Sequence, residues 1–224
     1  MPYVYDCDEL AGYVAFMGRD KYENDALLEH ALPIDWWFHV DKYSSAHVYV
    51  RPKKRTFQGG ELPSCAGALN NSASEPPAEV VRLVAALTKE NSIEGAKQNT
   101  VCVVYTPVLN LQKTAVMSPG QVGFRDMSLV HRTRVPRADT MLLRQLKRAR
   151  SECTIEDMRH AREDFEQEQH CWSKAEARRR HAEEKARQEL AARERDARSY
   201  ARLHTKEAMT SNKEMNEDYE EEFL

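Results

Sequence analysis

The chain has 224 residues, of which 31% are charged, and a formal net charge of −3. This length allows one compact domain plus an appendage, and the near-neutral charge excludes a uniformly basic nucleic-acid coat. The chain has no long apolar run and no signal-peptide pattern, which predicts a soluble protein with no transmembrane segment. Its five cysteines are scattered and never in CxxC spacing. We therefore expect reduced thiols in a cytoplasmic or nuclear setting, with no metal site and no cofactor.

The first quarter of the chain predicts four strands and one helix. Residues 1–6 and 13–18 have the composition of two strands joined by a short turn, and residues 19–32 have apolar positions at helical spacing before Pro33. Two further strands, 36–40 and 47–51, are rich in aromatic and β-branched residues and are separated by a polar turn.

The next part of the chain completes a small globular domain. Residues 56–77 are rich in Gly, Ser, Asn and Pro, which predicts a flexible insertion loop. Residues 79–90 form an amphipathic pattern typical of a helix, and residues 100–105 predict a buried strand. With a last strand near 128–135, residues 1–136 predict an α+β fold, in which flanking helices cover a small mixed or antiparallel sheet.

The C-terminal part has a different composition. From residue 138 to about 206 neither Pro nor Gly occurs and opposite charges recur three or four positions apart, which predicts one long charged helix over 137–207. The heptad pattern is weak, which favours a mostly solvated single helix over a stable homodimer and leaves open a protein partner for this helix. Residues 208–224 are acidic and predict a disordered tail.

The strands at 36–40 and 47–51 carry the main functional signal. Side chains alternate between the two faces of a strand, so rings and charged groups from both strands are expected to gather on one side of the sheet. A face of this composition is typical of a surface that stacks bases and holds phosphate. The side chains expected on this face are Trp37, His39, Asp41, His47, Tyr49 and Arg51.

Cationic residues in turns and at strand ends are expected to extend this face. Together they could neutralise a phosphate backbone, although a cationic loop is often only solvated surface. Four more cations, at 144–150, extend the positive surface at the start of the long helix. The candidate phosphate-binding residues are Arg51, Lys53, Lys54, Lys97, Lys113 and Arg125.

The same strands raise an enzymatic alternative. His39, Asp41 and His47 lie near Ser44 and Ser45, the residue types of a nucleophile, a base and an orienting carboxylate. No nucleophile elbow is present, and the serines fall on a turn, where their hydroxyls ordinarily bond to the backbone. The pattern therefore favours a binding protein over an enzyme.

Several segments, taken in order, resemble the NFACT-R domain. The first is GRDKYEND at 18–25, followed by DWWFHVDKYSSAHVYVR at 35–51 and KENS at 89–92. The match continues with GAKQNTVCVVYTPVLNLQKT at 95–114 and PGQVGF at 119–124. The loop at 56–77 is longer than the family pattern, and the long helix matches it in charge only.

This resemblance implies an RNA-binding factor that associates with the ribosome or its large subunit and binds tRNA or rRNA, in translation or ribosome-associated quality control. Release or hydrolysis of peptidyl-tRNA by the His39–His47 face is one alternative. The others are a coiled-coil scaffold and binding of DNA, since phosphate contacts alone do not tell RNA from DNA. The strand face and the resemblance together predict phosphate contacts from Arg51, Lys97 and Lys113, base stacking by Trp37, and polar contacts from His39, His47 and Asn99.

Overall fold

The computed structural model describes residues 1–53, 75–137 and 140–199. Most of the predicted insertion loop 56–77 and the whole predicted tail 208–224 therefore lie outside the described residues. The chain divides into two compact units, Met1–His170 and Cys171–Leu224. The strands of the described chain all lie in the first unit.

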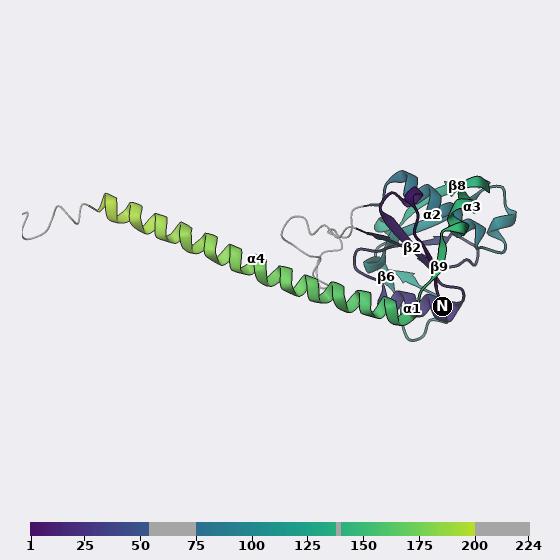
Figure 1. Cartoon of the computed structure of the whole chain (residues 1–224), viewed down its shortest axis with the longest axis horizontal. Coiled ribbons are helices and arrows are strands. Elements are labelled where there is room, and N and C mark those ends of the chain that lie inside the picture. Colours follow the sequence, from purple (N-terminus) through teal and green to yellow (C-terminus); the bar gives the residue numbers. More distant parts are fainter. Residues whose placement is uncertain (54–74, 138–139, 200–224) are drawn as a thin grey trace, which may run out of the picture. The chain divides into compact units, whose positions relative to one another are not determined.

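A seven-stranded sheet forms the centre of the first unit (Figure 1). Every neighbouring pair in it is antiparallel, so the α+β fold class is confirmed and, of the two predicted sheet types, the antiparallel one forms. The strand order is β8-β5-β3-β4-β2-β1-β9, and β6 (Leu111–Gln112) and β7 (Gly123–Phe124) form a separate two-stranded ribbon. The strands of the large sheet are β1 (Tyr3–Tyr5), β2 (Tyr13–Met17), β3 (Trp36–Val40), β4 (Val48–Pro52), β5 (Val101–Pro107), β8 (His131–Val135) and β9 (Arg150–Glu152).

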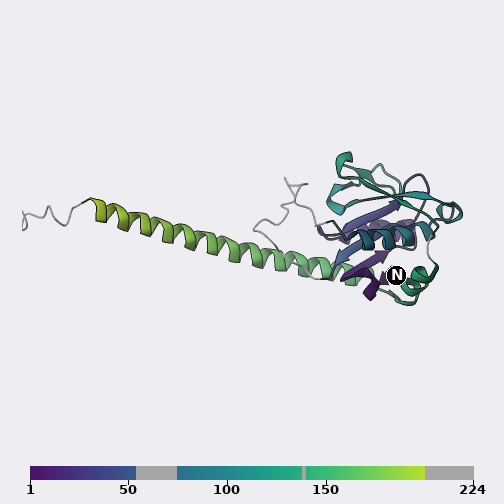
Figure 2. The same ribbon diagram turned by 90° about the horizontal axis from the view of Figure 1, so that it is seen from above.

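Two helices cover opposite faces of this sheet, and one of them, α2 (Ala78–Glu90), lies in front of the strands in Figure 2. Helix α2 packs its apolar side against Trp36 and Phe38, which point to one face of β3. Helix α1 (Lys21–His30) packs on the other face, and it begins where the Asp20 carboxylate accepts two backbone N–H groups at 2.8 Å. The sheet therefore has two apolar faces, each with its own core.

The predicted long charged helix is confirmed as α4 (Ile155–Arg198), but its predicted start at residue 137 is wrong, because α3 (Thr140–Arg148) and β9 come first. Strand β9 pairs with β1, and these backbone hydrogen bonds outweigh the local helical propensity of its residues. Thr154 and Asp157 then form a reciprocal cap, in which each backbone N–H donates to the other residue's side-chain oxygen at 3.0 Å or less.

The part of α4 that lies beyond His170 is largely exposed and highly charged. The predicted pairs of opposite charge form along it, for example between Arg179 and Glu176 at 2.8 Å and between Arg187 and Glu184 at 2.6 Å. In the described part of the chain, no helix combines the length and the apolar character needed to cross a bilayer.

Candidate nucleic-acid interface

The strand alternation that the sequence predicts is confirmed for the aromatic rings. His39 stacks on Trp37 with ring centroids 5.4 Å apart, and His47 meets both rings edge-on at 5.1 and 5.3 Å. Trp37 and Tyr49 are paired across β3 and β4 and lie in the same core cluster. Trp37, His39, His47 and Tyr49 therefore share a face, as expected.

The expectation that this face is exposed is wrong. Trp37 is only 2% exposed, since it packs in a cluster with Leu27 of α1 and Phe124 of β7. Tyr49 is buried in the same cluster, and burial raises the pKa of its phenol well above the ordinary value. Trp37 therefore has no free face on which to stack a base.

Arg51 is also enclosed, which corrects its predicted role as a phosphate contact. Its guanidinium makes two parallel 2.8 Å hydrogen bonds to the Asp35 carboxylate, and Asp35 is fully buried while Arg51 is 6% exposed. Asp35 also accepts the Leu32 N–H at 2.8 Å, and the guanidinium lies 4.9 Å from the centre of the Phe16 ring. The Arg51 charge is thus already neutralised inside the fold.

Lys113 has a structural set of partners as well. Its ammonium bonds to the Asp25 carboxylate at 2.9 Å and to the carbonyls of Ser118 and Gln121 at 2.9 and 3.0 Å, which ties the 113–121 loop to α1. All three of its protons are therefore used within the fold.

The remaining candidate residues differ in how open they are. Lys53 is exposed and pairs with Asp6, whereas Lys54 lies outside the described residues. Lys97, Asn99 and Arg125 are exposed. Arg125 donates to the Leu111 carbonyl at 3.4 Å, and the backbone carbonyl of Asn99 accepts from Lys89. Lys97 is exposed at the end of the short turn η3 (Gly95–Lys97).

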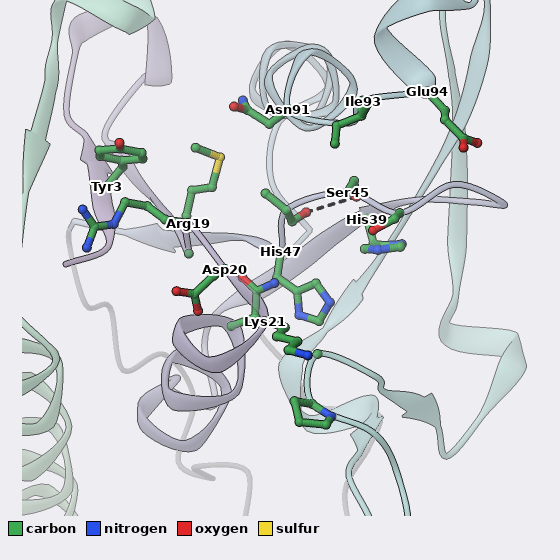
Figure 3. Close-up of a pocket in the computed structure, with 17 residues that line it drawn as sticks. Tyr3, Arg19, Asp20, Lys21, His39, Ser45, His47, Asn91, Ile93 and Glu94 are labelled. Atoms are coloured by element: carbon green, nitrogen blue, oxygen red, sulfur yellow. Dashed lines mark hydrogen bonds between the residues drawn. The ribbon is translucent and has the colours of Figure 1, made fainter.

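A hollow of about 660 Å³ opens beside the two histidines (Figure 3). Figure 3 shows His39 and His47 between the start of α1, with Asp20 and Lys21, and the turn that carries Asn91, Ile93 and Glu94. Pro119 and Gly120 also line it, and the Gly120 backbone has a φ of 79°, which residues other than glycine rarely adopt. Four of the segments in which the sequence resembles the NFACT-R pattern thus contribute to one surface: 18–25, 35–51, 89–92 and 119–124.

The wall of this hollow holds two buried polar atoms that have no hydrogen-bond partner within the described chain. They are Nδ1 of His47, a residue 2% exposed, and Oδ1 of Asn24, a residue 6% exposed. Gly18 makes the position of Asn24 possible, since a Cβ there would lie 2.3 Å from Oδ1. Buried polar groups are nearly always paired, so these atoms indicate a place where a ligand or water completes the bonding.

The histidines of the hollow are neutral at ordinary pH. Burial lowers the pKa of His47 to about 3, with a further lowering from His39 that Asp25 and the Gly120 backbone only partly offset. Burial also lowers the pKa of His39. The histidines therefore add neutral donors and acceptors to a lining that also holds two cations, Arg19 and Lys21, and two carboxylates, Asp20 and Glu94.

The groups needed for ester hydrolysis are present but not assembled. The Ser45 hydroxyl donates to the Ala46 carbonyl and accepts the Val40 N–H, both at 3.1 Å, so it bonds to the backbone as expected. Asp41 lies 3.9 Å from Arg132 and does not orient an imidazole within hydrogen-bond distance in the described chain. The same described residues contain no group of three or more metal-ligating side chains.

The sequence interpretation missed the residues of the hollow that come from α1 and the glycine turn. Asn24, Lys21 and Gly120 lie in segments that the sequence analysis used only as evidence of family resemblance. Nothing in their local sequence indicates that they come together in space. The available signal was the set of motifs itself, since separate motifs of one family often converge on one site.

Comparison with known proteins identifies the family of the chain. The family described as "NFACT protein RNA binding domain" matches residues 1–126. The chain belongs to this family. All residues that line the hollow fall inside the matched range. Family membership supports a general role in RNA binding and a nucleic-acid partner.

Similar proteins share most of the length of the chain. It is 37% identical to Coiled-coil domain-containing protein 25 of Bos taurus over 210 residues, covering 94% of this chain and 93% of the relative. The Dictyostelium discoideum homolog of that protein is 36% identical and covers 67% and 66%. Protein JLP2 of Saccharomyces cerevisiae is 33% identical and covers 62% of each chain.

Proposed function

We propose that this chain binds tRNA or rRNA and associates with ribosomes or large ribosomal subunits, in translation or in the quality control of stalled ribosomes. The observation that carries the proposal is the convergence of the family's motifs on one hollow with two unpartnered buried polar atoms. Association with ribosomes implies a cytoplasmic location.

In this proposal an unpaired nucleotide enters the hollow. RNA is recognised mainly through splayed-out bases whose edges form hydrogen bonds. The half-buried His39 presents a polar ring to the hollow. The neutral imidazole of His47 and the side-chain oxygen Oδ1 of Asn24 add such bonds when the ligand displaces the side chains that bury them. A charged imidazole would instead favour phosphate, so the low pKa of His47 supports contact with a base.

The phosphates of the same RNA would meet the exposed cations around the hollow. Lys21 lines the hollow, and Lys97 lies three residues after Glu94, which also lines it. Both lysines are exposed. Arg125 and Asn99 complete the proposed set of exposed contacts. Trp37, Arg51 and Lys113 are left out of it, since each is committed to internal packing or bonding.

The test is co-sedimentation with purified large subunits together with a tRNA-binding titration. We expect Lys21→Glu combined with Lys97→Glu to weaken both, by about fivefold for each lysine whose charge is reversed. A control variant, Lys174→Glu with Arg193→Glu, makes the same change in net charge on the exposed part of α4. If the first pair leaves both measurements unchanged, or if the control reduces them equally, the assignment fails.

A further inference from the structure

A second concave surface lies apart from the histidine hollow, between α2, the end of β8 and α3. It consists of two adjoining hollows of about 490 and 320 Å³ that share Arg137 and Leu143 in their walls. Below we call this surface the α2–α3 groove. Residues 133–137, with Leu143, Arg144 and Lys147, supply much of its wall, and they lie outside the range 1–126 that the family matches.

The α2–α3 groove is positively charged in a chain that is negative overall. Its lining has six cations and three carboxylates, an excess of three positive charges, whereas the chain has a net charge of −3. The carboxylates are Glu9, Glu79 and Glu90, and the cations are Arg82, Lys89, Arg134, Arg137, Arg144 and Lys147.

Among the described residues, most of these cations form no ion pair. Lys147 pairs with Glu90 at 3.0 Å, but the four arginines of the α2–α3 groove are exposed and form no ion pair with a described residue. A guanidinium offers up to five donors in a planar fork that matches phosphate geometry. Arg137 and Arg144 line the same hollow, so their donors face a common space.

Beneath them lies a buried ammonium group. Lys89 is 3% exposed, and its Nζ donates to the carbonyls of Asn99, Val135 and Pro136 at 3.0 to 3.4 Å. It therefore holds the 135–137 turn against α2 but has only neutral partners. Glu90 lines the same hollow, and a bound anion there would add to the negative charge near this buried cation.

The floor of the α2–α3 groove is aliphatic, with Leu83, Ala86, Val135 and Leu143 in its lining. Among the described residues, no aromatic ring lines either hollow, so bases have no aromatic side chain to stack on there. A site with guanidinium groups and no aromatic ring is suited to a phosphate backbone, and phosphate contacts do not discriminate between base sequences.

We propose that the α2–α3 groove holds the phosphate backbone of an RNA strand, as a second contact surface beside the histidine hollow. This inference rests on the proposed RNA-binding function. Phosphates here exchange their counterions for arginine side chains, so each contact adds to the salt dependence of binding. The α2–α3 groove thus adds affinity, and the polar hollow contributes the contacts to bases.

The test is a fluorescence-anisotropy titration of the intact chain with an oligouridine and an oligoadenosine of about 20 nucleotides at several salt concentrations. Arg137→Glu combined with Arg144→Glu is expected to lower the affinity at least about tenfold for both oligomers. The slope of log affinity against log salt is expected to become shallower by about 1.4, or 0.7 for each contact. Arg137→Gln combined with Arg144→Gln removes the charges without adding carboxylates and is expected to give the same change in slope.

A charge-matched control and the binding of the unaltered chain distinguish failure of the groove proposal from failure of the proposed function. Lys174→Glu combined with Arg193→Glu, matched in net charge, is expected to leave the slope unchanged. If the unaltered chain binds neither oligomer, the proposed function itself fails. If it binds both but the Arg137 and Arg144 variants keep its affinity and slope, the groove proposal alone is overturned. It is also overturned if a synthetic acidic peptide with the sequence of residues 214–224 binds in an Arg137- and Arg144-dependent manner while RNA affinity is unaffected by the substitutions.

Discussion

The buried pair of Arg51 and Asp35 distinguishes a structural arginine from an RNA-binding one. We expect Arg51→Met to lower the free energy of unfolding by about 3–5 kcal/mol, since it leaves the Asp35 carboxylate buried without its cation. The two 2.8 Å bonds and the full burial of Asp35 identify a buried ion pair. Removing one partner of a buried pair costs more stability than breaking a surface pair. For a domain of this size, the midpoint of thermal unfolding would fall by about 6–20 °C.

The assay is urea unfolding followed by tryptophan fluorescence, with oligouridine binding measured on the folded protein at low temperature. Arg125→Met, at an exposed arginine, is the matched control and is expected to change the stability by less than about 0.5 kcal/mol. Asp35→Leu combined with Arg51→Met should cost less than the sum of the two single changes, because no unpaired charge remains. A stable Arg51→Met protein that has lost RNA binding would refute this reasoning.

Three further predictions concern the hollow and its surroundings. Because the pKa of His47 is lowered to about 3, the unfolded chain binds a proton near pH 6.5 that the folded chain does not. Stability should therefore fall by about 2 kcal/mol from pH 7 to pH 5, and urea unfolding of His47→Gln should show a smaller fall, whereas an equal fall would contradict the assignment. Lys113→Ala should lower the midpoint of thermal unfolding, and Lys97→Ala should leave it unchanged. In an RNA titration of the folded proteins, only Lys97→Ala should weaken binding directly. The reverse pattern in the two assays would restore the predicted role of Lys113 as a phosphate contact. Gly18→Ala should cost about 1–3 kcal/mol in urea unfolding, since its Cβ would lie 2.3 Å from Asn24 Oδ1, and an unchanged stability would show that Asn24 can move away.

The strand pattern predicted which side chains share a face but not whether that face is open. Alternation depends only on neighbours in the chain, so the grouping of Trp37, His39 and His47 could be predicted from their positions. Their exposure depends on Leu27 and Phe124, which come from distant segments and cover the face. A strand with one polar face is expected to expose that face to solvent. The Trp and His rings of this face have the composition of such a polar face, but the sheet is covered on both sides.

Charged residues were the least predictable part of the site. Arg51 was expected to bind phosphate with its neighbouring cations, but its partner Asp35 lies 16 residues earlier and meets it only through the pairing of β3 and β4. The break before α4 did have a local signal, since Thr154 and Asp157 have the spacing of a reciprocal cap. Strand β9 had no such signal, because its pairing with β1 is a tertiary contact.

The most direct test of the account is photo-crosslinking of the intact chain to an RNA that carries 4-thiouridine, followed by mass spectrometry of the linked peptides. RNA that enters the histidine hollow should crosslink to peptides spanning 39–47 and 91–97, and Lys21→Glu with Lys97→Glu should reduce these products. Crosslinks confined to the charged helix beyond residue 170, with none in those two peptides, would contradict the central claim that the hollow is the RNA-binding surface.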